Sequence, residues 1–189
     1  ALLESAAAVI NDQLYVFGGF TFRWQATRDV YSYDPRLDQW TQRQNMPTPV
    51  THVNSAIDTS KVWFAGGFVG NHPGKATDEV WQYDAQIDQW MAGIPLPQKR
   101  AGGGLAIINR ELHYFGGFAE DRDTTCIEHW YLPLAQGNQW VETVPLPTPR
   151  GHISVTTVKN KIYAIGGQIQ HDTNPVDQSS VYCFDGTTQ

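Results

Sequence analysis

Short runs of apolar and β-branched residues, separated by glycine, proline, asparagine and aspartate, follow one another along the chain. In the third stretch of the chain the runs are at 104–109, 112–117, 126–132 and 139–144. They are too short for helices and show no 3.6-residue apolar period. Their composition and the turn residues that bound them are typical of strands. The pattern predicts an all-β chain of short antiparallel strands.

Pairs of polar residues separate the first strand of each stretch from the second. Tight hairpins are expected at 11–12, 109–110 and 159–160, because two-residue polar loops favour this connection. Proline clusters at 47–49, 95–97 and 145–149 then end the pairing, since proline has no N–H to donate to a ladder. The chain is therefore predicted to consist of units of four strands.

The units are copies of one repeat. A glycine pair ends an aromatic, β-branched run four times, at 18–19, 66–67, 116–117 and 166–167. A second marker has the same register, and it consists of Trp40, Trp90 and Trp140. A four-stranded sheet of this size cannot bury both faces alone, so neighbouring sheets must pack face to face around an axis. Each tryptophan offers apolar surface to the next sheet. These features predict a β-propeller.

The glycine pair after a hydrophobic strand, the Tyr-Asp at 33–34 and 83–84, and the tryptophan that follows resemble the kelch repeat. The resemblance covers essentially the whole chain and implies four-stranded blades at about 1–46, 47–96, 97–146 and 147–189 of one propeller segment, 1–189. The fourth unit stops before its tryptophan and is expected to lack its outer strand. Because kelch propellers usually have five to seven blades, further blades of the same chain or a second copy are expected to complete a larger ring.

Composition excludes several classes of function. The net charge is −6 with only 13 Lys and Arg, which argues against a nucleic-acid surface. No apolar stretch approaches the roughly 20 residues that cross a bilayer, so membrane insertion is not expected. Cys126 and Cys183 show no metal or redox spacing and are expected to be free thiols. The low lysine content and the similarity to secreted kelch proteins favour an extracytoplasmic location, secreted or periplasmic, with the cytoplasm as the alternative.

The loops that join the second and third strands, and those that join units, emerge on one face of a propeller, where function concentrates. The candidate ligand-binding residues on this face are Arg23, Trp24, His72, Arg100, Asp121, Arg122, Arg150, His152, His171 and Asp172. Arginine can bind carboxylates or hydroxyl pairs with two donors, and tryptophan can stack on sugar rings. Arg100, Arg150 and His152 recur with the repeat, as does His52, so a scaffold role competes with ligand contact for these residues.

The kelch resemblance implies either a binding module or an enzyme scaffold. The favoured interpretation is a non-catalytic module that binds a protein or a glycan on the loop face. The alternative is a carbohydrate-acting enzyme similar to the sialic-acid mutarotase. No catalytic residue, cofactor or metal is assigned. The six histidines show no short ligand spacing, so a metal site would have to be assembled across blades.

Overall fold

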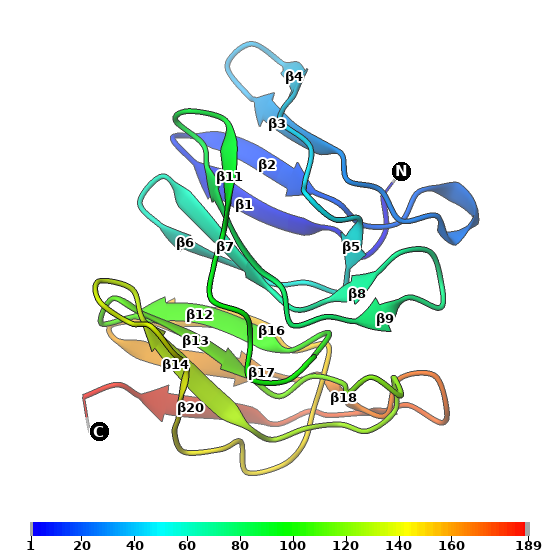
Figure 1. The fold of residues 1–189 in the computed structure, drawn as a ribbon, viewed down its shortest axis with the longest axis vertical. Coiled ribbons are helices and arrows are strands. Elements are labelled where there is room, and N and C mark those ends of the chain that lie inside the picture. Colours follow the sequence, from blue (N-terminus) through cyan, green and yellow to red (C-terminus); the bar gives the residue numbers. More distant parts are fainter. Residues whose placement is uncertain (1, 188–189) are drawn as a thin grey trace.

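The computed structural model describes residues 2–187, which form four twisted antiparallel sheets arranged side by side around an axis (Figure 1). The first sheet contains β1 (Ala6–Ile10), β2 (Gln13–Phe17), β3 (Val30–Asp34) and β4 (Gln39–Gln42). The second contains β6 (Ser55–Asp58), β7 (Lys61–Ala65), β10 (Val80–Asp84) and β11 (Gln89–Ala92). The predicted all-β propeller architecture is confirmed.

The third sheet contains β12 (Gly104–Ile108), β13 (Glu111–Phe115), β14 (His129–Pro133) and β15 (Val141–Glu142). The fourth contains β16 (Ser154–Val158), β17 (Lys161–Ile165) and β20 (Val181–Asp185). The first strand of each sheet faces the axis, where β1, β6, β12 and β16 are neighbours. Within residues 2–187, no helix has the length and apolar character needed to cross a bilayer.

Two strands of the third sheet are shorter than the sequence predicts. β14 starts at His129 instead of 126, because the N–H of Cys126 is used outside the sheet, donating to the carbonyl of Gly117 at 2.9 Å. β15 covers only Val141 and Glu142 instead of the whole predicted run. The hairpin turns follow the prediction. At 11–12, 109–110 and 159–160 both residues have positive φ, as a two-residue turn of type I′ requires.

Small secondary sheets, which the sequence did not predict, build the loop face. β5 (Val50–Thr51), β8 (Phe68–Val69) and β9 (Lys75–Ala76) form one of them, and β18 (Gln168–Ile169) pairs with β19 (Val176–Asp177). A short 3₁₀ turn, η1 (Phe22–Trp24), lies in the first such loop. Because β5 belongs to an inter-unit segment and β8 to a loop between second and third strands, the two kinds of loop share one face, as expected (Figure 1).

The glycine pairs connect each blade to the next through the backbone. Gly66 and Gly67 both have positive φ, at 67° and 104°, where a residue with a Cβ is strained. The N–H of Gly67 donates to the carbonyl of Arg100 at 2.8 Å. A Cβ on Gly66 would lie 2.3 Å from the same carbonyl oxygen. The equivalent bonds run from Gly19 to Val50 at 3.1 Å and from Gly117 to Arg150 at 2.8 Å.

The tryptophans reinforce the contact between blades, and here one expectation is wrong. Trp90 packs on Phe17 of the preceding blade, with ring centroids 6.1 Å apart, instead of on the next blade. Its indole N–H donates to the carbonyl of Gln44, also in the preceding blade, at 3.0 Å. Trp140 repeats the arrangement with the carbonyl of Ile94 at 2.9 Å. These carbonyls belong to the extended segments that follow the outer strands β4 and β11. Each tryptophan therefore packs on the preceding blade.

The core of the third blade contains a buried histidine pair. Nδ1 of His113 lies 2.9 Å from Nε2 of His129, whose Nδ1 lies 3.0 Å from the carbonyl of Val144. These distances fit one placement of the ring protons, in which Nδ1 of His129 donates to this carbonyl and Nδ1 of His113 donates to Nε2 of His129. Burial lowers the pKa of His113 to about 3 and that of His129 to about 4. Both imidazoles are therefore neutral in the folded protein at pH 7.

The two cysteines are free thiols. Cys126 is buried, and burial raises the pKa of its thiol to about 11, whereas Cys183 on β20 is exposed. Cys126 is thus protonated at neutral pH and a poor nucleophile.

We expect Gly66→Ala to destabilise the protein more than Gly70→Ala. Both positions have positive φ, so each substitution costs about 1 to 2 kcal/mol of backbone strain. Only at Gly66 does the new Cβ also meet a backbone carbonyl, while at Gly70 nothing lies within 4 Å. Chemical denaturation measures the free energies of unfolding. Equal losses for the two variants would contradict the role assigned to the glycine pair.

The free energy of unfolding is expected to decrease as the pH falls from about 6.5, the ordinary histidine pKa, to about 4, the pKa of His129 in the folded protein. In this window the unfolded chain takes up protons that the buried pair in the folded chain does not, so unfolding becomes more favourable as the pH falls. His113→Leu should reduce the slope of the free energy of unfolding against pH by up to about 1.4 kcal/mol per unit. His72→Leu, on an exposed loop, serves as the control. An unchanged slope in His113→Leu would refute the assignment.

Candidate functional site at the loop end of the channel

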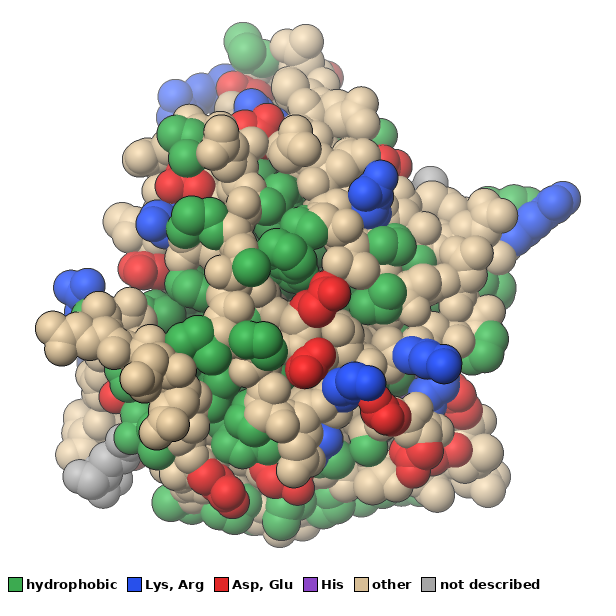
Figure 2. All heavy atoms as spheres, viewed as in Figure 1, with side chains coloured by type: hydrophobic (Ala, Val, Ile, Leu, Met, Phe, Trp, Pro, Cys, Tyr) green, Lys and Arg blue, Asp and Glu red, His purple; other side chains and the backbone are tan. Residues whose placement is uncertain are grey.

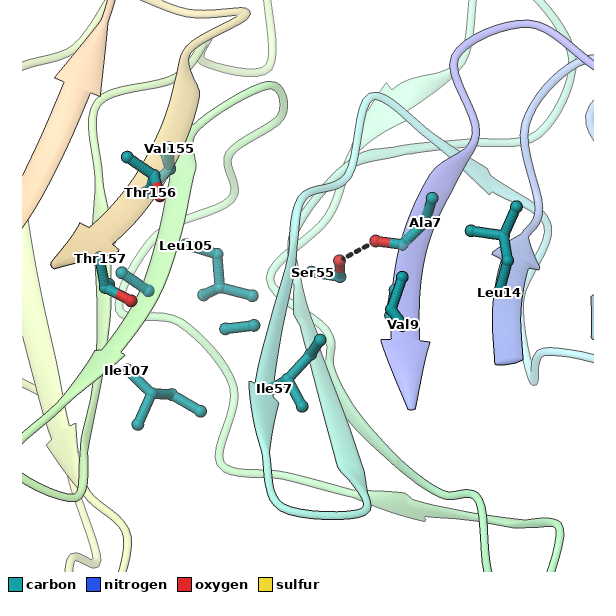
Figure 3. Close-up of a pocket in the computed structure, with 13 residues that line it drawn as sticks. Ala7, Val9, Leu14, Ser55, Ile57, Leu105, Ile107, Val155, Thr156 and Thr157 are labelled. Carbon is teal, nitrogen blue, oxygen red and sulfur yellow. Dashed lines mark hydrogen bonds between the residues drawn. The ribbon is translucent and has the colours of Figure 1, made fainter. Parts of the chain in front are cut away.

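The inner strands of the four sheets line an open channel of about 460 Å³. Figure 3 shows its walls, where Leu105 and Ile107 of β12 point toward β6 and Ile57 of β6 points toward β1. The hydroxyl of Ser55 is already used, since it donates to the carbonyl of Ala7 at 2.8 Å. A wall made mainly of alanine, valine, leucine and isoleucine offers little for binding a polar group. Polar chemistry therefore has to lie at the ends of the channel.

A second cavity, of about 360 Å³, is lined by residues that immediately precede the inner strands and so lies at the loop end of the channel. Its walls come from all four blades and consist of Glu4, Ser5, His52, Val53, Asn54, Gly102, His152, Ile153 and Ser154. Four of these residues occupy equivalent places in successive repeats, and all four have a positive φ between 51° and 65°. We call these places the axial positions, and they are Glu4, His52, Gly102 and His152.

Three histidines converge beside this cavity. One nitrogen each of His52, His152 and His171 lies within 4.8 Å of the other two. Nε2 of His171 is 3.2 Å from Nε2 of His52. The rings of His52 and His152 stack with centroids 4.9 Å apart and planes 26° apart. Phe68 and Phe118 enclose the ring of His171 from further sides, at 5.3 and 5.0 Å. The cluster joins the second blade to the fourth.

The other imidazole nitrogens have defined surroundings. Nδ1 of His171 lies 2.5 Å from a carboxylate oxygen of Asp172, so this nitrogen carries the proton that is donated. Nδ1 of His52 lies 2.9 Å from the hydroxyl of Thr51. Nε2 of His152 is buried and has no hydrogen-bond partner among the described residues. Polar groups thus hold the rings of His171 and His52 in place, whereas Nε2 of His152 has no such partner.

Burial and nearby charges lower the pKa values of two of the imidazoles. Burial is the largest cause of the lowered pKa of His52, about 3, and the nearby His152, His171 and Arg122 act in the same direction. Burial also lowers the pKa of His171, against the opposing effect of the Asp172 carboxylate. Neutral imidazoles can accept hydrogen bonds from a ligand or coordinate a metal ion.

Arg122 holds the loops around the cluster. Its Nε donates to Oδ2 of Asp172 at 2.6 Å, and a terminal nitrogen donates to the carbonyl of Gly74 at 2.8 Å. The guanidinium also lies 4.0 Å from the ring centroid of Phe68, a cation–π contact. It thereby connects the second, third and fourth blades. The paired guanidinium lowers the pKa of Asp172 to about 2, so the carboxylate is charged at any physiological pH.

Asp123, the neighbour of Arg122, holds the same loop of the fourth blade. One of its carboxylate oxygens accepts the N–H groups of His171, Asp172 and Thr173, at 3.2, 2.9 and 2.9 Å. These bonds lower the pKa of Asp123. The position of His171 is thus set by two adjacent side chains of the third blade.

The structure brings four of the predicted site residues together: Arg122, His152, His171 and Asp172. It places Arg100 and Arg150 away from the cavity. Both are buried, and Arg100 forms an ion pair with Glu128 at 3.2 Å. Arg150 is fully buried, donates to the carbonyls of Gly166 and Ser180, and lies 4.3 Å from the ring centroid of Tyr182. Their side chains anchor the inter-unit segments to their own blades.

The remaining predicted residues lie outside the cluster. Arg23 and Trp24 are exposed on η1, where Trp24 lies 6.0 Å from the ring of His72. Asp121 accepts hydrogen bonds from Asp123 and Thr124 and so stabilises its own loop. These four residues do not line the cavity at the loop end of the channel.

Of the nine residues that line the cavity, the predicted site residues include only His152; His52 and Glu4 are among the eight that they do not include. For His52, recurrence with His152 favours a hydrogen-bonding role between blades, and its Nε2 does lie 3.2 Å from Nε2 of His171 in the fourth blade. The same recurrence marks the axial positions. Glu4 has the same backbone conformation, with φ of 53°. Nothing in its sequence neighbourhood distinguishes it, because it precedes the first complete repeat marker.

The comparisons with known proteins agree with this architecture. A family model described as the KLHDC2/KLHL20/DRC7 Kelch-repeats domain matches residues 3–167, and the Kelch motif matches 149–189. The chain belongs to the kelch-repeat family. A solved kelch-like structure, titled "Structure of YjhT", superposes with a TM-score of 0.78 at 17% identity, over 89% of this chain and 59% of that one. That likeness supports the fold.

Curated relatives of this kelch chain match over short segments. N-acetylneuraminate epimerase of Pasteurella multocida is 34% identical over 70 residues, which cover 34% of this chain and 18% of the relative. Kelch-like protein terF of Aspergillus terreus is 31% identical over 68 residues, covering 34% and 15%. Beta-scruin of Limulus polyphemus is 36% identical over 59 residues, covering 31% and 6%. The matched segments thus span less than a fifth of each relative.

We expect Arg122→Met to destabilise the kelch fold by about 2 kcal/mol, because it leaves the buried carbonyl of Gly74 without its donor and removes the partner of Asp172. Hydrogen exchange should show lost protection in residues 168–178. Arg23→Met is the matched control, since Arg23 is exposed and its guanidinium lies over the ring of its neighbour Phe22. Equal protection in the two variants would contradict the anchoring role of Arg122.

Proposed function

We propose that this kelch chain is a carbohydrate-binding module whose site is the cavity at the loop end of the channel. The observation that carries the proposal is a concave, polar site of about 360 Å³ built by all four blades. This volume is at the small end of the range for small-molecule pockets, roughly 300 to 1,000 Å³. Such a cavity suits a single sugar ring better than a peptide chain.

The lining supports hydroxyl recognition. Glu4 offers a carboxylate that accepts hydrogen bonds, and Ser5 and Ser154 offer hydroxyls that donate or accept. His52 adds a neutral imidazole, because its pKa is lowered to about 3. Sugar hydroxyls need both kinds of partner, since each of them donates one hydrogen bond and accepts others.

The charge of the cavity favours a neutral sugar over an acidic one. No lysine or arginine is among the residues that line it, and Glu4 is acidic. The nearest arginine of the cluster, Arg122, is already paired with Asp172. An anionic ligand would therefore meet a carboxylate without a free cation to offset it. Over the face drawn in Figure 2, basic and acidic side chains are interspersed, without a continuous basic stripe of the kind that binds nucleic acid.

Exposed aromatic rings extend the surface beyond the cavity. Phe22 is 81% exposed and Trp24 is 55% exposed. The ring of Trp24 lies 5.5 Å from that of Phe20, which lies 6.1 Å from His52 at the cavity wall. An apolar ring face of this kind can stack on a second sugar ring of a longer glycan.

A sugar isomerase is a second candidate, favoured by one observation. Glu4 and His52 line the same cavity, and His52 continues through His171 to the carboxylate of Asp172. A carboxylate and an imidazole on one cavity are groups that can exchange protons with a sugar. The name of one relative, N-acetylneuraminate epimerase, describes that class of reaction for the relative.

A glycan array followed by titration of any bound sugar tests the binding proposal. Glu4→Gln is expected to weaken binding about tenfold, the equivalent of roughly 1.4 kcal/mol for a lost charged hydrogen bond. Glu120→Gln is the matched control, because Glu120 is an exposed carboxylate paired with Lys99 outside the cavity. Absence of binding to every sugar on the array would overturn the proposal.

The same sugars separate binding from isomerisation. We expect the protein to leave the rate of exchange between α and β anomers unchanged, as measured by NMR on a bound reducing sugar. Acceleration that disappears in Glu4→Gln, with Glu120→Gln still active, would replace the binding module with the isomerase. Acceleration that survives in Glu4→Gln would exclude Glu4 from the chemistry.

A further inference from the structure

We propose that His52, His152 and His171 form a binding site for a divalent transition-metal ion of the zinc type. The site would join the second and fourth blades at the loop end of the channel. It does not depend on the carbohydrate proposal, because it concerns metal binding by the chain itself.

The geometry of the nitrogen atoms carries the inference. Three imidazoles from two blades bring one nitrogen each within 4.8 Å of the others. Two of these atoms, Nε2 of His52 and Nε2 of His171, are 3.2 Å apart. Ligand nitrogens about 2.0 to 2.1 Å from a tetrahedral zinc ion lie roughly 3.3 Å from one another. The pair therefore already has the spacing of two zinc ligands, and His152 completes a set of three.

The outer partners of the rings fit the same interpretation. A metal-binding histidine usually engages its second nitrogen with a carboxylate, a carbonyl or another polar group, which fixes the ring and its tautomer. Nδ1 of His171 is held by Asp172, and Nδ1 of His52 is held by Thr51. Both rings thus direct Nε2 to the shared space. Nε2 of His152 is buried without a partner, which is costly for a polar atom unless a ligand satisfies it.

The surrounding charges allow a cation. Arg122 is the basic side chain in contact with the cluster, through a 3.4 Å approach to His171. It is paired with Asp172 at 2.6 Å, and Asp123 adds a second carboxylate bonded to the backbone of His171. The two carboxylates together outweigh the single guanidinium. The charges that face the site therefore do not oppose a divalent ion.

The donor set selects the class of metal. Three imidazole ligands suit zinc, copper, nickel or cobalt, whereas calcium and magnesium prefer oxygen ligands. Three histidines also leave a coordination position for water or for an oxygen of a ligand. Since His52 and His152 line the 360 Å³ cavity, an ion at this site lies at the cavity wall. The ion and a sugar hydroxyl could then meet at one place.

Titration of tag-free, chelator-treated protein with Zn²⁺ alone tests the inference. We expect one Zn²⁺ per chain, a rise in melting temperature with Zn²⁺ concentration, and a tetrahedral visible spectrum when Co²⁺ replaces Zn²⁺. His152→Gln and His171→Gln should each weaken binding by roughly 100-fold or more, because losing a ligand costs more than the roughly 10- to 100-fold cost of losing an outer partner. His72→Gln, an exposed histidine outside the cluster, should bind as the unmodified chain does.

Several outcomes would overturn the proposal. Wild-type protein that shows neither stoichiometric binding nor a Zn²⁺-dependent rise in melting temperature contains no such site. Equal affinity in the wild type, His152→Gln and His171→Gln would place the ion elsewhere. If a glutamine variant does not fold, Co²⁺ absorption of the wild type still decides, since a spectrum without tetrahedral character excludes the predicted ligand set. Sugar binding measured in chelator-treated protein reports separately on the proposed function.

Discussion

The hydrogen bond from the second glycine of the first three pairs to the first residues of the next unit controls the arrangement of the blades. It joins Gly67 to Arg100 and Gly117 to Arg150 through backbone atoms alone. Such a bond needs positive φ at two successive residues and room for a carbonyl where a Cβ would stand. Once the bond forms, the inter-unit segment must pass beside the loop of the preceding blade. The loop face and its cavity follow from that single constraint.

On this face, the 168–178 loop is held by charged side chains of the third blade. Arg122 and Asp123 are adjacent in the sequence, and together they hold the 168–178 loop, one through Asp172 and the other through the backbone of His171, Asp172 and Thr173. A buried guanidinium is stable only where its donors are satisfied, and Gly74 supplies a further acceptor. The buried guanidinium therefore finds all of these partners within the loops of the same face.

The repeat made most of the fold predictable, because glycine pairs, polar hairpin turns and prolines each determine local backbone geometry. The same regularity located Arg122, His171 and Asp172, which break the repeat. For His52, recurrence with His152 indicated a hydrogen-bonding role between blades, and the contact of its Nε2 with His171 of the fourth blade agrees with that role. The partner itself could not be predicted. Residues 52 and 171 meet only because the blades curve around an axis, and a contact between residues 119 positions apart leaves no spacing signature. The small sheet β5–β8–β9 was missed for a similar reason, as its two-residue strands are too short to show a period.

The axial positions show how one backbone can carry different chemistry. Glu4, His52, Gly102 and His152 share the left-handed conformation, so the repeat supplies four equivalent places around the end of the channel. At Gly102 a Cβ would lie 3.3 Å from the ring of His152 and 3.0 Å from that of Phe118. A larger residue there would therefore displace the imidazole that completes the histidine cluster. The missing side chain at 102 is as necessary to the site as the imidazoles at 52 and 152, because it leaves the space in which the rings from the second and fourth blades stack.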